Sequence, residues 1–222
     1  MKRIIVAIDG MRLEESEALV NNLTSVGIRD YIWGFKLNHT MIKHVWKFKM
    51  FGNVFVDLKL HDIPKTTSSV LNFLKDIHAD MTTVHLSMGS RNLKSIRPAT
   101  KGIDILGVGV LTSMDDEDTR DVFDKKGKEI QRNMFEIAIE SKNTLAGVVM
   151  SPQDLDLFNE FDPEHKLKRI CPGIRVSETK DDQKRVGTPK MAFDGGADLL
   201  VIGRPITRAV NPVAAVQEML NV

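Results

Sequence analysis

This sequence of 222 residues contains a single cysteine and almost no excess of charge of either sign. Because Cys171 has no partner for an internal disulfide, its presence as the only cysteine favours a reducing compartment. The 31 basic residues nearly balance the 30 acidic ones, and no polybasic cluster occurs. This balance argues against nucleic acid or an anionic membrane as the main partner.

Long apolar runs are also missing. No segment approaches the roughly 20 apolar residues that a transmembrane helix needs. The apolar run after Lys2 and Arg3 is interrupted at Asp9, after only five residues. We therefore interpret this run as a first strand rather than as a secretion signal, and we expect a soluble protein of the cytoplasm.

What the chain does contain is a regular alternation of short apolar runs and amphipathic stretches. Apolar residues at helical spacing predict the helices, as at Val70, Phe73, Leu74 and Ile77. No linker or low-complexity segment interrupts the alternation, so we predict one domain over residues 1–222. The eight predicted strands lie at residues 3–8, 31–37, 54–61, 81–85, 103–111, 145–150, 169–174 and 198–202.

Eight strands that alternate with helices predict an α/β fold, either a (β/α)₈ TIM barrel or an open sheet wound on both faces. Polar residues stand at the strand ends all along the chain, which favours the barrel. Right-handed crossovers would then bring the C-terminal ends of all strands to one rim.

The stretch at residues 54–66 carries charge where a buried strand should not. Val54 and Val56 would face one side of the strand, whereas Asp57, Lys59 and His61 would share the other. A carboxylate, an ammonium and an imidazole do not suit a dry core. This stretch therefore points to chemistry at the C-terminal end of the third strand.

Several other strands end in charged or polar residues that would meet at the same rim. A single such residue is usually a solvated loop charge, but Asp57, Lys59 and Lys36 together are not explained in that way. In a barrel, the active site lies at this rim. The rim candidates are Asp9, Lys36, Asp57, Lys59, Asp62, His85, Thr112, Arg175 and Arg204.

A phosphate site is predicted at the end of the chain. Gly203 and Arg204 directly follow the eighth strand, and Arg175 follows the seventh. Loops after these two strands, together with a helix N-terminus, form the usual phosphate site of barrels. The two arginines would add charge-assisted hydrogen bonds.

A metal site is the main chemical alternative, because His61 and His85 could both point into the barrel mouth near Asp57. No compact ligand motif occurs, however, and Lys36 and Lys59 would place cations where a divalent ion should sit. We predict no metal. A metal-dependent lyase or epimerase acting on another sugar phosphate, and a non-catalytic binder of nucleotides, stay open as alternatives.

Residues 57–66, DLKLHDIPKT, resemble the signature of the orotidine 5'-phosphate decarboxylase family, an Asp-x-Lys-x-x-Asp core formed by Asp57, Lys59 and Asp62. The resemblance covers the whole chain, and further matching motifs keep the family's order and spacing. They lie at residues 7–9, 35–36, 84–85, 110–113, 172–175, 182–189 and 201–206.

The resemblance implies a carboxy-lyase of de novo pyrimidine biosynthesis that removes CO₂ from orotidine 5'-monophosphate, giving UMP, without metal or organic cofactor. Lys59 would protonate C6 as the general acid, and Asp57 would lie beside the departing carboxylate. Lys36 and Asp62 would complete an alternating Lys-Asp-Lys-Asp chain. Among substrate-binding residues, Asp9 and Lys36 would hold the ribose hydroxyls and Thr112 would lie near the pyrimidine.

The resemblance also implies a phosphate grip and a partner subunit. Arg175, Gln183, Gly203 and Arg204 would hold the phosphate, and the loop at residues 174–187 would close over it. In the family the second aspartate reaches across from the neighbouring subunit. Asp62 and Thr66 therefore imply a homodimer with shared active sites.

Overall fold

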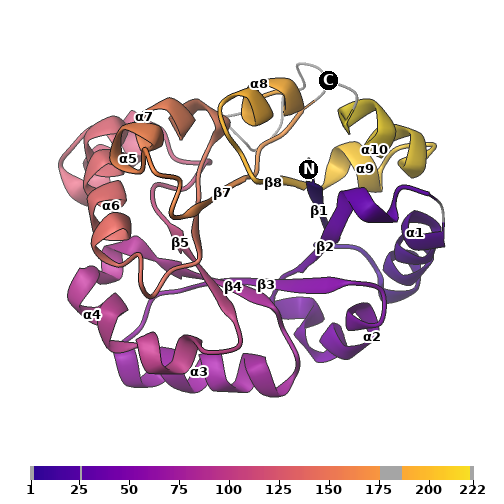
Figure 1. The fold of residues 1–222 in the computed structure, drawn as a ribbon, viewed down its shortest axis with the longest axis horizontal. Coiled ribbons are helices and arrows are strands. Elements are labelled where there is room, and N and C mark those ends of the chain that lie inside the picture. Colours follow the sequence, from indigo (N-terminus) through magenta and orange to yellow (C-terminus); the bar gives the residue numbers. More distant parts are fainter. Residues whose placement is uncertain (1–2, 26, 176–186, 221–222) are drawn as a thin grey trace.

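Eight parallel strands close into a barrel in chain order, so that β1 pairs with both β2 and β8 (Figure 1). This computed structural model describes residues 3–25, 27–175 and 187–220. The closed ring confirms the predicted (β/α)₈ barrel and excludes the open sheet. The strands are β1 (Arg3–Ala7), β2 (Ile32–Leu37), β3 (Asn53–Leu60), β4 (Met81–His85), β5 (Asp104–Val108), β6 (Gly147–Val149), β7 (Lys168–Cys171) and β8 (Leu199–Ile202).

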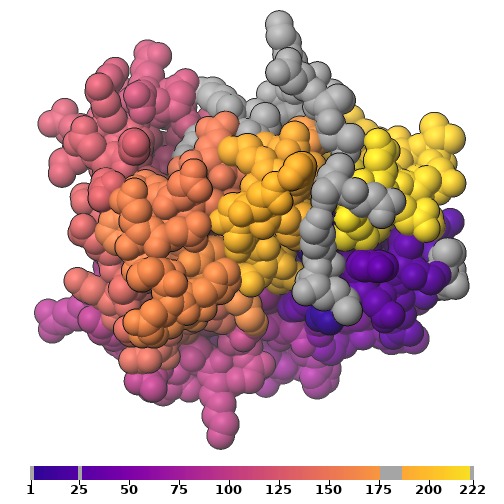
Figure 2. All heavy atoms as spheres, turned by 45° about the horizontal axis from the view of Figure 1, so that its top comes forward, coloured from indigo at the N-terminus to yellow at the C-terminus, as the bar shows by residue number. Residues whose placement is uncertain are grey.

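Helices surround the barrel, and α10 packs against α1, so the first and last helices of the chain lie side by side (Figures 1 and 2). Among the described residues, no helix has the length and apolarity to cross a bilayer. The helices are α1 (Leu13–Ser25), α2 (Val45–Lys49), α3 (Pro64–Asp76), α4 (Ser90–Ser95), α5 (Asp116–Phe123), α6 (Gly127–Glu140), α7 (Leu155–Phe161), α8 (Pro189–Asp194), α9 (Arg204–Thr207) and α10 (Pro212–Leu220).

Short 3₁₀ turns complete the connections: η1 (Arg29–Tyr31), η2 (His39–His44), η3 (Leu86–Met88), η4 (Arg97–Thr100) and η5 (Pro152–Asp154). The sequence predicts one helix around residues 41–49, and the structure divides it into η2 and α2. The acidic run at residues 115–118 lies at the start of α5, where the Asp115 side chain accepts hydrogen bonds from the backbone N–H groups of Glu117 and Asp118. Carboxylates suit this position because the helix dipole is positive there.

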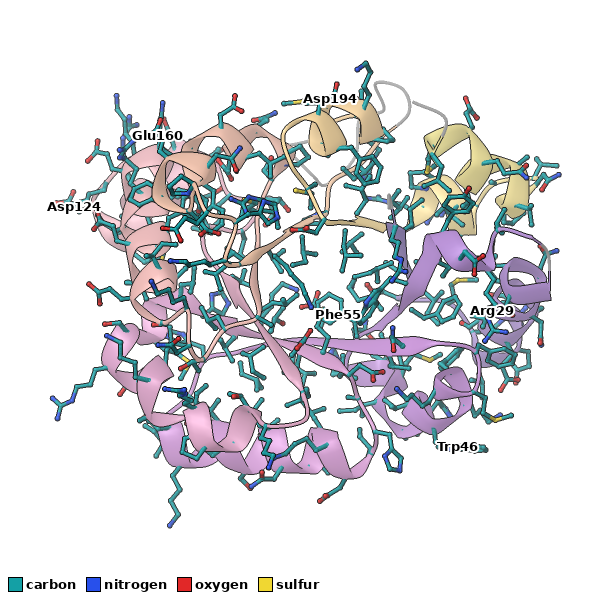
Figure 3. The ribbon with its side chains drawn as sticks, in the orientation of Figure 1. Arg29, Trp46, Phe55, Asp124, Glu160 and Asp194 are labelled. Carbon is teal, nitrogen blue, oxygen red and sulfur yellow. The ribbon has the colours of Figure 1, made fainter. Side chains whose placement is uncertain are left out.

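The alternation of strand side chains produces two apolar cores. Outward-facing residues such as Ile4 and Val6 pack in the large core that includes the helices. Inward-facing residues fill the barrel, and Phe55 lies near its centre (Figure 3). This inner layer forms the floor beneath the rim, and it consists of Ile5, Phe55, Met81, Leu106, Ile170, Leu199 and Val201.

The C-terminal end of β3 is irregular. Its pairing with β4 shifts register between Val56 and Leu60, and Lys59 has a φ of 51°. Leu58 and Leu60 nevertheless pack against the outer core, as the alternating pattern predicts. The irregular segment is the one that carries Asp57 and Lys59.

Candidate active site

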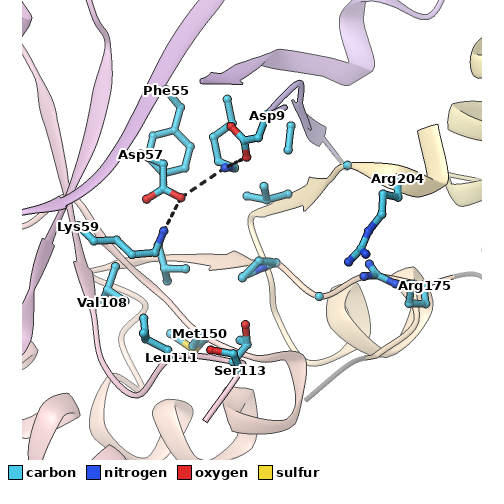
Figure 4. A pocket seen from close by; sticks show the side chains of 18 of the residues that line it. Asp9, Phe55, Asp57, Lys59, Val108, Leu111, Ser113, Met150, Arg175 and Arg204 are labelled. Atoms are coloured by element: carbon cyan, nitrogen blue, oxygen red, sulfur yellow. Dashed lines mark hydrogen bonds and ion pairs between the residues drawn. The ribbon is translucent and has the colours of Figure 1, made fainter. Parts of the chain in front are cut away.

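A pocket of about 540 Å³ opens at the C-terminal rim of the barrel (Figure 4). Phe55 and Val201 of the inner layer contribute to its lining, and the remaining walls come from strand ends and the loops that follow them. The pocket brings together eight of the residues that the sequence predicts for the site: Asp9, Lys36, Asp57, Lys59, Thr112, Arg175, Gly203 and Arg204.

Charges of alternating sign form a chain along one wall of this pocket. Lys36 Nζ is ion-paired with Asp9 and lies 3.4 Å from Asp57 Oδ2. Lys59 Nζ donates to the same Asp57 oxygen at 2.7 Å. The side chains of Lys36 and Asp57 are 12% and 13% exposed, whereas that of Lys59 is 40% exposed. Of the two lysines in this row of alternating charges, Lys59 is thus the one whose ammonium is more open to a ligand.

The two lysines decide the charge of Asp57. Burial alone would raise the pKa of this carboxyl, but Lys36 and Lys59, together with hydrogen bonds from Lys59 and Thr83, hold it below its ordinary value of 3.8. Asp57 is therefore a carboxylate at neutral pH. It can hold both ammonium groups in fixed positions.

Asp9 has an acceptor atom left over. Its Oδ2 pairs with Lys36, whereas its Oδ1 is buried without a hydrogen-bond partner among the described residues. A buried acceptor of this kind is costly unless something donates to it. The geometry suits a ligand hydroxyl group that enters the pocket beside Lys36.

Arg175 and Arg204 lie on the side of the pocket away from Asp57 and Lys59 (Figure 4). At Gly203, which opens α9, an added Cβ would meet nothing closer than 3.5 Å, from the Ala7 carbonyl oxygen. The missing side chain therefore leaves room in the pocket rather than relieving a clash. Two guanidinium groups beside this open backbone form an arrangement suited to an anion such as phosphate.

Backbone hydrogen bonds join the two ends of the predicted phosphate loop. The backbone N–H of Arg175 donates to the carbonyl of Gly187 at 3.0 Å, and the backbone N–H of Gly187 donates to the carbonyl of Gly173 at 3.1 Å. Gly173 has a φ of 75°, a conformation that favours glycine. Gln183, the fourth residue predicted for the phosphate grip, lies outside the described residues.

Asp62 and Thr66 do not line the pocket of their own chain. Both are exposed at the start of α3, where Asp62 Oδ1 accepts the backbone N–H of Ile63. Ile63, which lies between them, is 65% exposed. These residues form an exposed edge beside the site.

His61 and His85, the ligands of the alternative metal site, face each other with ring centroids 5.4 Å apart, and neither lines the pocket. Within the described ranges, no three His, Cys, Asp or Glu side chains are grouped so that they could hold a metal ion. Cys171 is buried, and burial raises the pKa of its thiol, so it packs as a small apolar residue.

Thr83 is the main residue of the site that the sequence does not predict. It is buried in β4, and its Oγ1 contacts both Asp57 and the backbone of Lys59. A threonine in a strand is ordinary, so its residue type carries no signal. Its register could have indicated its position, since Thr83 shares the inward face of β4 with Met81, which belongs to the inner layer.

Residues 2–219 match the Orotidine 5'-phosphate decarboxylase / HUMPS family. The chain belongs to this family. The resemblance predicted from the motifs is thereby confirmed. Relatives named orotidine 5'-phosphate decarboxylase include that of Wolbachia pipientis subsp. Culex pipiens, 34% identical over 233 residues, with 100% of this chain and 98% of the relative covered. The orotidine 5'-phosphate decarboxylase of Idiomarina loihiensis is also 34% identical over 233 residues, with 100% of this chain and 97% of the relative covered.

Solved structures of this family have the same fold. Orotidine 5'-phosphate decarboxylase from Lactobacillus acidophilus superposes with a TM-score of 0.78 at 26% identity and covers 100% of this chain and 98% of its own. Orotidine 5'-monophosphate decarboxylase from Methanocaldococcus jannaschii, complexed with the inhibitor BMP, has a TM-score of 0.76 over 100% of both chains. At 20% identity, the second likeness shows the fold alone.

Proposed function

We propose that this protein is an orotidine 5'-phosphate decarboxylase, a carboxy-lyase that converts orotidine 5'-monophosphate to UMP and CO₂. The observation that carries the proposal is the alternating chain Asp9–Lys36–Asp57–Lys59 in a pocket whose other side holds two arginines. One cavity thus contains both the charged groups for the reacting end of the substrate and the arginines for its phosphate. The reaction would serve pyrimidine biosynthesis, and the single, buried Cys171 agrees with the reducing cytoplasm as the compartment.

In the proposed reaction, the bond between C6 and the carboxylate breaks, and its electron pair stays on C6 while CO₂ leaves. Lys59 Nζ then donates a proton to C6, and the neutral amine regains a proton from solvent. Asp57 would orient the ammonium through the 2.7 Å hydrogen bond and would lie beside the departing carboxylate. A cation fixed in advance at the position of the developing carbanion lowers the barrier without reorganisation.

The rest of the substrate would extend from this wall to the arginines. Asp9, through its unsatisfied Oδ1, and Lys36 would hold the ribose hydroxyls. Thr112 would lie near the pyrimidine, and Arg175, Gly203 and Arg204, with Gln183, would hold the phosphate. Binding energy from the remote phosphate would then support the chemical step. The loop at residues 174–187 that is predicted to close over the phosphate includes residues 176–186, which lie outside the described residues.

We propose that the reaction needs neither a metal nor an organic cofactor. The carboxylate oxygen that Asp57 turns toward the lysines is already shared by two ammonium groups. A divalent ion at this position would be repelled by both of them. Activity that persists in excess chelator is the expected result, and loss of activity that added Mg²⁺ or Zn²⁺ restores would favour the metal-dependent alternative.

We propose further that the enzyme is a homodimer in which Asp62 and Thr66 complete the active site of the neighbouring subunit. Asp62 extends the alternating charge pattern in sequence but lies outside its own pocket. The exposed Ile63 beside it offers an apolar contact for a second chain. The fourth member of the Lys-Asp-Lys-Asp chain would therefore come from the partner.

The decisive test is a spectrophotometric assay with orotidine 5'-monophosphate. We expect wild-type protein to form UMP, and we expect Lys59→Ala to reduce kcat by at least about 100-fold, since a positioned general acid contributes roughly 10² to 10⁴ in rate. Lys94→Ala removes a surface lysine 3.9 Å from Glu140 and should keep wild-type activity. A folded Lys59→Ala protein with a near wild-type rate would show that another group donates the proton.

A further inference from the structure

Strand β4 places the hydroxyl of Thr83 between the two residues proposed for the chemistry. Its Oγ1 accepts a hydrogen bond from the backbone N–H of Lys59 at 2.8 Å and donates one to Asp57 Oδ1, also at 2.8 Å. Thr83 is only 1% exposed and does not line the pocket. A substrate bound in the pocket would therefore not contact Thr83. Its two contacts are both with groups that would touch one.

The first contact holds a backbone conformation that needs support. Lys59 has a φ of 51°, in the left-handed region that side chains with a Cβ disfavour. It lies where the pairing of β3 with β4 shifts register, so the regular ladder does not impose this conformation. Non-glycine residues keep such conformations only when their surroundings fix them. Here the side chain of Thr83 accepts the N–H of the strained residue.

The second contact fixes the carboxylate. Asp57 Oδ2 serves Lys59 at 2.7 Å and Lys36 at 3.4 Å, and Oδ1 accepts the hydroxyl of Thr83. With both oxygens engaged, the plane of the carboxylate cannot rotate freely. The Thr83 hydrogen bond also favours the ionised form of Asp57, after the larger effects of burial, which acts in the opposite direction, and of the two lysines.

We propose that Thr83 is a positioning residue whose hydroxyl sets the backbone of Lys59 and the carboxylate of Asp57 in the geometry needed for proton transfer. The proposal rests on the proposed decarboxylase function. One hydroxyl group fixes the ammonium from two directions, through the main chain that carries it and through the carboxylate that orients it. Such a residue acts on the chemical step rather than on the affinity for substrate.

The test removes the hydroxyl while keeping the shape of the side chain. In Thr83→Val, we expect kcat to fall by about 10-fold to 100-fold, because misplacement of a reacting group by about 1 Å can cost 10²-fold. The KM for orotidine 5'-monophosphate should stay within about twofold, since no binding group is removed. Thr83→Ser keeps the hydroxyl and should retain kcat within about threefold of wild type.

The neighbouring Thr82 supplies a matched control. It is also buried in β4, and its hydroxyl donates at 2.7 Å to the carbonyl of Val56 rather than to Asp57 or Lys59. Thr82→Val therefore loses an equally buried hydrogen bond without touching the pair. An equal loss of kcat in Thr82→Val and Thr83→Val, an unchanged kcat in Thr83→Val, or an effect on KM alone would overturn the proposal.

A second measurement keeps this proposal separate from the proposed function. Hydrogen exchange at the Lys59 amide, followed by NMR, should be at least about 10-fold faster in Thr83→Val than in wild type and unchanged in Thr82→Val. Wild-type protein without decarboxylase activity would refute the function alone, whereas an unchanged amide would refute the role of Thr83. If Thr83→Val does not fold, the smaller Thr83→Ala replaces it with the same expectations.

Discussion

At the scale of the residue, Lys59 stands apart from the other non-glycine residues with positive φ. Among the described residues these are Lys59, His78, Asp124 and His165. Asp124 ends α5 and His78 closely follows α3, positions where a left-handed residue commonly ends a helix. Lys59 instead lies within β3. Its conformation is explained by the site rather than by the end of an element.

The half-buried His85 is a single residue that should make stability depend on pH. Burial, followed by the nearby His61 and Lys59, lowers its pKa below 6.5, although Asp57 acts in the opposite direction. As pH falls below 6.5, the unfolded chain therefore binds this proton before the folded protein does. The folded state loses stability through the interval between 6.5 and the lower pKa of the folded protein.

The predicted outcome concerns the free energy of unfolding in urea, measured between about pH 7.5 and about pH 5.5. It should decline more steeply with falling pH in wild type than in His85→Gln, because the variant has no imidazole to protonate at this position. Parallel pH profiles for the two proteins would show that His85 has the same proton affinity in both states.

At the scale of the element, β7 is fixed to α7 by a buried cation. Arg169 is 1% exposed, and its guanidinium donates to Asn159 Oδ1 at 2.9 Å and to the carbonyls of Asp162 and Leu167 at 2.7 and 3.0 Å. It also lies 3.4 Å from the Asp162 carboxylate. Its donors are thereby matched by acceptors, as a buried guanidinium requires.

Arg169→Ala should lower the free energy of unfolding by about 3–5 kcal/mol, because it leaves Asp162 buried without its counter-ion. The adjacent Lys168 forms a half-exposed pair with Asp104 at 2.8 Å, so Lys168→Ala should cost less than about 1 kcal/mol. Urea denaturation of both variants provides the comparison. Similar small losses in the two would mean that solvent reaches the Arg169 site on mutation.

The elements that the sequence predicts are those specified by local pattern. Apolar runs and helical spacing locate all eight strands and the helix at α3, since burial of one face determines them. The predicted fifth strand, 103–111, is too long. In the structure β5 ends at Val108, and the N–H of Val110 donates to Gln131 Oε1 from α6 at 2.9 Å. A partner so distant in sequence leaves no local pattern.

The candidate site likewise contains residues that the local sequence pattern indicates and one whose role depends on the folded structure. Asp57, Lys59 and Lys36 can be predicted because their charges contradict the apolar surroundings of their strands, and the pocket does contain them. Thr83 cannot be predicted from residue type, because its importance arises only from the register of β4 against the irregular end of β3. Sequence patterns therefore indicate the charged groups, whereas the group that orients them depends on the folded geometry.

At the scale of the whole molecule, closure of the barrel brings residues from both ends of the chain to one cavity. Asp9 follows β1, and Gly203 and Arg204 follow β8, its hydrogen-bonded neighbour. Asp62 and Thr66, like the rim candidate His85, are predicted site residues that this closure leaves outside the pocket. In a two-fold dimer, the same exposed edge of each chain can meet the pocket of the other.

The proposed sharing of each active site between two subunits can be tested by mixing two inactive variants. Lys59→Ala and Asp62→Ala should each have little activity as homodimers, but a hybrid dimer has one site with both residues intact. After subunit exchange at equal concentrations, half of the dimers are hybrids, so the mixture should regain about a quarter of wild-type activity.

A mixture of Lys59→Ala with Asp57→Ala is the control. Because both of these residues belong to one chain's half of the site, every site in that mixture keeps a defect. Dimer formation is measured separately by sedimentation, and a sedimenting dimer whose first mixture stays as inactive as the control would place each active site within a single chain.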